Sequence, residues 1–261
     1  MGSEMCIRDS WQFSVTEAIL YGGVGQRLEF AYLNPFIFYH GEQMNGPGLA
    51  GNTLGTLEIS YHGDQWRAYT ELLIDDIQLD HEVKGDLEPN ELGLVTGFDL
   101  ADPLNIEGLY LGLEYTALTN RTYKTVNPVE WYTHRNVPIG YSGGSDLDVW
   151  DLEISKYLDK WQAILDFQYL RQGEGDMNRG WDSPWMDSTV TMQTGYHEPF
   201  PTGVVEKTLD LGLELRWCPS YQRYAFLRIN YRNIQNVAHS DAEEQKLILT
   251  LGLHWDFRYR F

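Results

Sequence analysis

The C-terminal end of the chain alternates apolar and other residues with a period of two. Every second residue from Leu247 to Phe261 is apolar, and most positions between them carry polar side chains or glycine. This period is typical of a strand with one apolar face. A strand that crosses a bilayer needs about 9–11 residues and places aromatic residues at the membrane interfaces. A soluble edge strand of this kind would leave a long, flat, apolar edge exposed, so the pattern favours a membrane-spanning strand.

The same alternation recurs upstream, for example between Leu209 and Trp217. Roughly ten strands are predicted in this way. They lie at residues 11–20, 53–61, 66–77, 91–100, 108–117, 148–157, 161–171, 209–217, 224–232 and 247–261. No segment has the period of an amphipathic helix, so the sequence predicts an all-β protein.

The connections between these strands alternate in length without exception. Short turns are predicted near residues 62–65, 101–107, 158–160 and 218–222. Longer connections are predicted near residues 21–52, 78–90, 118–147, 172–207 and 234–245. Short periplasmic turns and long extracellular loops are typical of transmembrane barrels. With Phe261 at the periplasmic side every short turn lies there too, which predicts a transmembrane antiparallel up-and-down β-barrel in the bacterial outer membrane.

Charge narrows the possible partners and places the ionised side chains. The chain carries 38 Asp and Glu against 19 Lys and Arg, a formal net charge of −19. Such a chain repels phosphate backbones, so no nucleic-acid partner is expected. Several charged residues within strands fall on the polar face, where they are expected to face a hydrated interior or to pair across strands. Among them are Asp75, Glu114, Asp166, Asp210, Glu214, Arg216, Arg228, Arg232, Asp256 and Arg258.

The first ten residues are expected to be foreign to the protein. Residues 5–10, Met-Cys-Ile-Arg-Asp-Ser, resemble the translation of a sequencing adaptor. Residues 1–10 are therefore excluded from fold reasoning, and the barrel is expected to begin at Trp11.

Three short blocks carry a family resemblance. They are residues 28–39 (LEFAYLNPFIFY), residues 69–76 (YTELLIDD) and residues 134–148 (HRNVPIGYSGGSDLD). In their order and spacing, together with the terminal strand, they resemble the capsule-assembly Wzi family of Gram-negative outer-membrane barrels. The resemblance implies a larger barrel of about eighteen strands, of which residues 11–261 would be the C-terminal portion, without the signal peptide and opening strands. It also implies a non-enzymatic role: organising or retaining capsular polysaccharide or exopolysaccharide at the cell surface, with lectin-like binding in some members.

Two of the long loops hold residues suited to glycan binding. Aromatic faces cover the C–H surfaces of sugars, and carboxylate and amide oxygens accept hydrogen bonds from sugar hydroxyls. The candidates are Tyr123, Trp131, Tyr132, His134 and Arg135 in the loop near 118–147, and Trp181, Trp185 and Tyr196 in the loop near 172–207. The alternative is that these aromatic residues pack the loops together or fold into the barrel mouth.

The last strand also resembles the C-terminal signal by which outer-membrane barrels are recognised for assembly. Its aromatic residues are Trp255, Phe257, Tyr259 and Phe261. The expected partners are therefore the barrel-assembly machinery during biogenesis, outer-membrane lipid, and surface polysaccharide.

The sequence carries no catalytic motif that we can identify. There is no H-E-x-x-H and no G-x-S-x-G, so neither an enzyme nor a cofactor is expected. Two aspartate groups, Asp75-Asp76-Asp80 and Asp146-Asp148-Asp151, lack the ligand spacing of a calcium loop, so no metal site is expected either. The alternative function is a porin-like diffusion channel, which the acidic excess would bias toward cations. Three of the loops are long enough to fold inward and plug such a pore.

Overall fold

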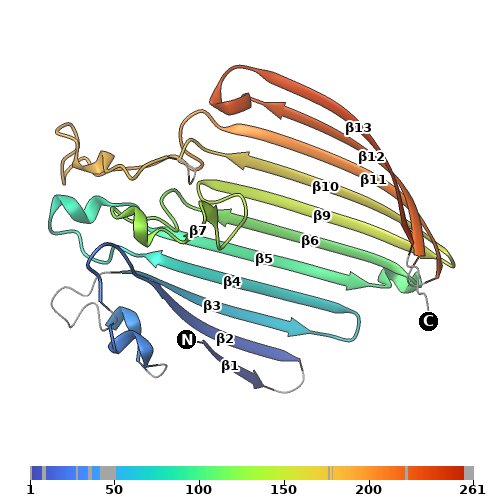
Figure 1. Cartoon of the computed structure of the whole chain (residues 1–261), viewed down its shortest axis with the longest axis horizontal. Helices are drawn as coiled ribbons and strands as arrows, with labels where there is room; N and C mark the ends of the chain where they lie inside the picture. Colours follow the sequence, from blue (N-terminus) through green and yellow to red (C-terminus); the bar gives the residue numbers. More distant parts are fainter. Residues whose placement is uncertain are drawn as a thin grey trace.

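One antiparallel sheet dominates the structure (Figure 1). The computed structural model describes residues 2–7, 10–27, 29–34, 37–41, 51–175, 177, 179–220 and 223–255. Within these residues the sheet has eleven strands, and neighbouring strands follow one another along the chain apart from a small hairpin between β6 and β9. The strands are β1 (Gly2–Ile7), β2 (Trp11–Leu20), β3 (Asn52–His62), β4 (Trp66–Asp76), β5 (Glu91–Ala101), β6 (Leu109–Leu118), β9 (Leu147–Leu158), β10 (Trp161–Gln172), β11 (Glu206–Ser220), β12 (Arg223–Gln235) and β13 (Glu243–Trp255).

The remaining elements are short and lie in the connections. The hairpin pairs β7 (Thr133–His134) with β8 (Val137–Pro138). The described 3-10 helices are η1 (Ala31–Leu33), η2 (Lys84–Leu87), η3 (Pro103–Asn105), η4 (Pro128–Glu130), η5 (Pro184–Met186) and η6 (Val237–His239). No helix in the described part of the chain is both long enough and apolar enough to cross a membrane.

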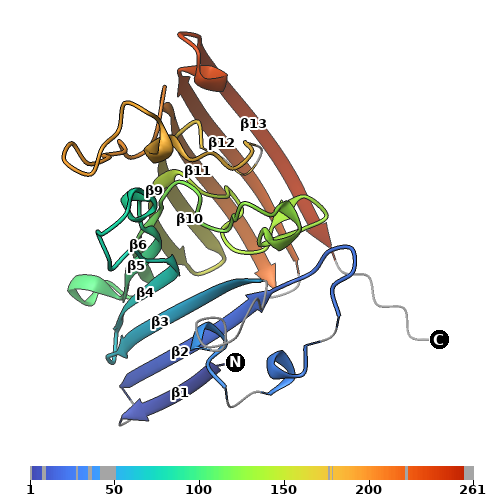
Figure 2. The same cartoon turned by 90° about the vertical axis from the view of Figure 1, so that its left-hand side faces the viewer.

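The predicted strands are confirmed, with ends that differ by a few residues. The sheet is curved, and its described edges are β1 and β13 (Figure 2). Residues 256–261, which include Phe257, Tyr259 and Phe261, lie outside the described residues. Residues 2–7, which we expected to be foreign, form β1 and pair with β2, with Gly2 opposite Thr16. Main-chain hydrogen bonds allow many sequences to join a free sheet edge, so the foreign origin of residues 1–10 stays a prediction.

The two faces of the sheet reverse the burial pattern of a soluble protein. In β11 the leucines point outward, and Leu211, Leu213 and Leu215 are exposed, Leu213 by 53%. The alternating carboxylates point inward and are buried, with Asp210 and Glu214 exposed by 8% and 5%. An apolar outward band with a polar inner face is the arrangement of a membrane barrel wall.

An aromatic row crosses the outward face near the short turns. The rings of Trp11 and Tyr61 lie 4.8 Å apart, and those of Tyr61 and Trp66 lie 4.6 Å apart, measured between centroids. Trp161 and Trp217 are direct cross-strand neighbours farther along the same end of the sheet. Such a girdle is typical of the membrane–water interface of a barrel, where a ring meets both lipid and water.

The long loops gather at the opposite end of the sheet (Figure 1). The first long loop (residues 119–146) packs onto the inner face, because Tyr123 joins Leu54, Leu118, Leu147 and Val149 in one buried cluster. This cluster is the apolar core of the described structure, and it lies beneath the loop.

Candidate functional site

A buried arginine fastens the second long loop (residues 173–205) to the first. The side chain of Arg121 is only 2% exposed, and its guanidinium lies 2.7 Å from Asp182 Oδ1 and 2.8 Å from Glu198 Oε2. Its Cζ atom also lies 4.8 Å from the ring centre of Trp185. Burial by itself lowers the pKa of Arg121, but the hydrogen bonds and charges of Glu198 and Asp182 outweigh it and raise the pKa above its usual value. The guanidinium therefore stays charged and fully paired.

A second buried network supports the same junction. Asp146 is completely buried and accepts hydrogen bonds from the backbone amides of Gly175, at 2.7 Å, and Thr202, at 2.9 Å, and from the Thr202 hydroxyl. Lys124 Nζ donates to the carbonyl oxygen of Gly175 at 2.9 Å. A Cβ on Gly175 would lie 2.1 Å from Asn120 Oδ1, so a larger residue there would displace the Asn120 side chain. Both loops are thus held by buried polar contacts that rigidify them.

The candidate residues of the first loop lie around a stacked tyrosine pair. Tyr123 is buried, and its ring stacks on Tyr132 with centroids 5.7 Å apart. The backbone amide of Tyr123 donates to Asp75 Oδ2 at 2.5 Å, which ties the loop to the inner face of β4. Trp131 is half-buried and its indole N–H donates to the carbonyl oxygen of Thr125 at 2.8 Å.

His134 and Arg135 lie in the exposed β7–β8 hairpin. Arg135 and Asn136 form its turn with φ values of 53° and 64°, the left-handed conformation that two-residue hairpin turns require. These two candidates are open to solvent, whereas Tyr123 is not.

The candidate residues of the second loop surround Arg121. Trp185 is 3% exposed and packs against both Arg121 and Trp181, whose ring meets it edge-on at 6.4 Å. Tyr196 donates a hydrogen bond to Glu198 Oε1 at 3.1 Å. Burial, reinforced by the Glu198 charge, raises the pKa of Tyr196 to about 12, so its hydroxyl stays protonated. Trp185 and Tyr123 therefore fit the alternative in which the aromatic residues pack the loops together. Part of the surface stays exposed on Trp181, Tyr196, Trp131 and Tyr132.

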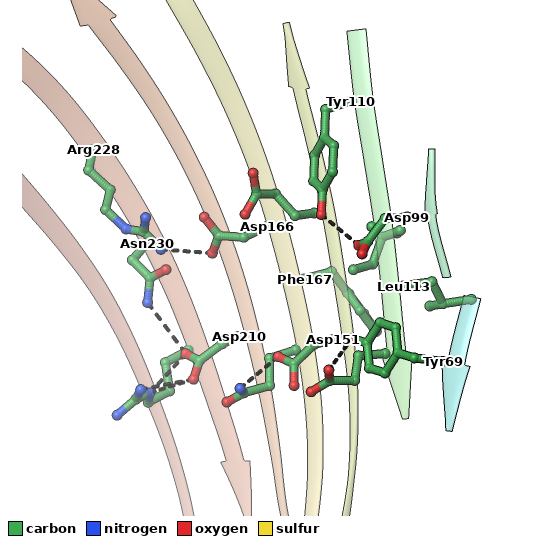
Figure 3. Close-up of a pocket in the computed structure, with 16 residues that line it drawn as sticks. Tyr69, Asp99, Tyr110, Leu113, Asp151, Asp166, Phe167, Asp210, Arg228 and Asn230 are labelled. Atoms are coloured by element: carbon green, nitrogen blue, oxygen red, sulfur yellow. Dashed lines mark hydrogen bonds and ion pairs between the residues drawn. The ribbon is translucent and has the colours of Figure 1, made fainter. Parts of the chain in front are cut away.

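A cavity of about 430 Å³ lies on the inner wall of the sheet (Figure 3). It spans seven neighbouring strands, from β4 to β12. Its acidic lining residues are Asp99, Glu114, Asp151, Glu153, Asp166 and Asp210, and its basic ones are Arg228 and Arg232.

The inward placement of the charged strand residues named in the sequence analysis is confirmed for those that the structure describes. Arg228 lies 2.7 Å from Asp166, and Arg232 lies 2.8 Å from Asp210, both across strands. Asp256 and Arg258 lie outside the described residues. Tyr69 also lines the cavity, and sequence reasoning did not single it out. Among the described side chains, no group of three His, Cys, Asp or Glu is arranged to hold a metal ion.

A comparison with known protein families assigns the chain to one of them. The family described as "Capsule assembly protein Wzi" matches residues 7–248. The chain belongs to this capsule assembly family. No curated protein matches the chain significantly.

Membership of this family identifies what each face of the sheet contacts. Members of the Wzi family are capsule assembly proteins of the outer membrane, so the apolar outward band contacts membrane lipid and the polar inner face lines the barrel interior. The cavity of Figure 3 therefore faces the interior, and the first long loop covers part of that interior.

Proposed function

We propose that the protein retains capsular polysaccharide at the cell surface by binding it, in a lectin-like manner, on the two long loops. The observation that carries the proposal is the buried Arg121 network, which fixes both loops in one arrangement. A fixed arrangement lowers the entropy that a flexible polymer and its binding site lose together. Trp131 in the first loop and Trp181 in the second keep part of their rings exposed.

The test is a titration of the purified, detergent-solubilised protein with the producing cell's own surface polysaccharide. Trp131→Ala and Trp181→Ala should each weaken binding about 2–10-fold, because an aromatic contact contributes about 0.5–1.5 kcal/mol beyond its buried area. Trp185 is unsuitable for this test, because its removal would also disturb Arg121. Trp150→Ala is the matched control, since Trp150 lies on the outward face of β9 and is 45% exposed.

Saturable binding that both loop variants weaken and Trp150→Ala leaves unchanged would support the proposal. Binding that is absent, or that none of the variants changes, would contradict it.

A cation-biased diffusion channel is the alternative function. The carboxylates of the inner-wall cavity favour it, whereas the packing of the first long loop on the inner face opposes a wide pore. Conductance in a planar bilayer distinguishes the two: large, cation-selective steps without polysaccharide binding would favour the channel.

We also propose that the barrel-assembly machinery recognises the aromatic end of the last strand. Trp255 ends β13, and the outward side chains from Leu247 to Leu253 are apolar, as a lipid-facing strand requires. Deleting Phe261 should lower the amount of protein that reaches the outer membrane, as measured by membrane fractionation. Unchanged insertion would contradict this role.

A further inference from the structure

The inner-wall cavity is separate from the loop residues proposed to bind polysaccharide. Its volume of about 430 Å³ falls within the range of about 300–1,000 Å³ that is usual for small-molecule sites. Its lining comes from strands of the sheet, so its shape is set by the wall itself (Figure 3).

The cavity presents hydrogen-bond donors and acceptors side by side. Gln168 Nε2 donates to Asp151 Oδ1 at 2.8 Å, and Asn230 Nδ2 lies 3.4 Å from Asp210 Oδ1. Arg228 supplies further donors beside its ion pair. Each sugar hydroxyl both donates and accepts a hydrogen bond, so a lining of alternating donors and acceptors suits a saccharide.

Two tyrosines lie along the wall because glycines make room for them. A Cβ on Gly112 would stand 2.6 Å from the Tyr110 hydroxyl, and one on Gly97 would stand 2.3 Å from the Tyr69 ring. Arg67 covers the Tyr69 ring with its Cζ 4.2 Å from the ring centre, so Tyr110 is the ring that we expect a ligand to meet. An aromatic ring lying along a wall offers the apolar surface that the C–H face of a sugar packs against.

The charge of the cavity selects among saccharides. Asp166 and Asp210 pair with arginines, but Glu114 and Asp151 have no cationic partner in any ion pair of the described structure. Glu114 and Asp151 are also direct cross-strand partners in the β6–β9 ladder. Like charges placed directly opposite destabilise a sheet, so a ligand that brings a positive charge between them relieves a repulsion already present. An acidic sugar would add to that repulsion.

We propose that the inner-wall cavity is a binding site for an amine-bearing sugar unit, with Glu114 and Asp151 receiving the ammonium group and Tyr110 packing against the ring. The proposal rests on the proposed function in one respect, namely that the protein's natural ligand is a polysaccharide. The site itself is defined by the wall of the barrel and needs no contact from the exposed loop aromatics.

The test compares two probes that differ only in acetylation: oligomers of glucosamine and oligomers of N-acetylglucosamine of equal length. Binding to the purified protein is measured by calorimetry at a pH where the amines are protonated. The wild-type protein should bind the glucosamine oligomers at least tenfold more tightly. The double variant Glu114→Gln with Asp151→Asn should lose this preference, while Asp159→Asn, an exposed turn carboxylate, should keep it.

Equal affinity of the wild-type protein for both probes would overturn the proposal, and this comparison does not depend on any variant folding. A preference that survives in the double variant would overturn it as well. Folding of this variant is checked by gel electrophoresis, in which a folded barrel migrates differently before and after heating. The loop variants separate this site from the surface site. If Trp131→Ala weakens binding of the polysaccharide but the wild-type protein shows no amine preference, the cavity proposal fails and the loop proposal stands. If the wild-type protein shows the amine preference but Trp131→Ala leaves binding of the polysaccharide unchanged, the loop proposal fails and the cavity proposal stands.

Discussion

Removing the Arg121 guanidinium should release the second long loop from the first. Breaking a buried ion pair by deleting one partner costs about 3–5 kcal/mol, because the remaining charge is left without a partner. In Arg121→Met the side chain of Glu198, only 13% exposed, would lose its ion pair and keep the hydrogen bond from Tyr196, whereas Asp182, 41% exposed, would regain water. We therefore expect the lower end, about 3 kcal/mol, which corresponds to about a hundredfold larger population of the open loop.

Hydrogen exchange read by mass spectrometry measures this population directly. The backbone amide of Thr202, which is bonded to Asp146 in the closed junction, should exchange about a hundredfold faster in Arg121→Met. Arg179→Met is the matched control, because Arg179 pairs with the same Asp182 at 3.4 Å but is itself 50% exposed. An exposed pair contributes about 0–1 kcal/mol, so the control should change exchange by about fivefold or less. Equal effects of the two variants would refute the role assigned to the buried guanidinium.

Three further predictions concern other parts of the molecule. Burial is the main cause that raises the pKa of Glu88 from 4.5 to about 7. The loop that holds Glu88 should therefore be most stable below pH 4.5 and should lose that stability as the pH rises through about 7. Glu88→Gln should remove this pH dependence from the hydrogen-exchange rates of the loop, once they are corrected for the intrinsic effect of pH on exchange. Gly97→Ala would place its Cβ 2.3 Å from the Tyr69 ring and should destabilise the folded barrel by about 1–3 kcal/mol, seen as a lower temperature at which heating shifts its gel migration. Gly55→Ala, whose Cβ would meet its nearest atom at 4.0 Å, should destabilise it less. Leu213→Arg on the outward face should cost about 2–4 kcal/mol and lower membrane insertion; unchanged insertion would contradict the assignment of the faces.

The strands and their faces could be predicted from the sequence because both are encoded locally. A period of two fixes which side chains share a face, and the alternation of Leu213 with Glu214 assigns one face to lipid and the other to the interior. The lengths of the connections carry the second part of the signal, since they depend only on where the alternation stops. The family assignment confirmed both conclusions, because the outer-membrane fold that they predict is the fold of the matched family.

The arrangement within the site could not be predicted, because it depends on contacts between distant parts of the chain. Trp185 reads as a possible sugar platform, yet it is buried against Arg121 in the other loop. The repulsive pair of Glu114 and Asp151 exists only because of the register between β6 and β9. A shift of that register by one residue would turn one carboxylate to the lipid side, and the intervening long loop gives no local signal for the register.

The location of the acidic charge limits the kind of polymer that the protein can hold. The formal net charge of −19 repels a polyanion at long range, although salt screens this repulsion beyond about 8 Å at physiological ionic strength. An acidic capsule would therefore depend on short-range contacts at exposed cations such as Arg135 in the hairpin turn. A neutral or amine-bearing polymer meets no such barrier, and it gains the attraction of the carboxylates on the inner wall. The placement of charge thus favours ligands with amine or neutral sugar units over strongly acidic ones.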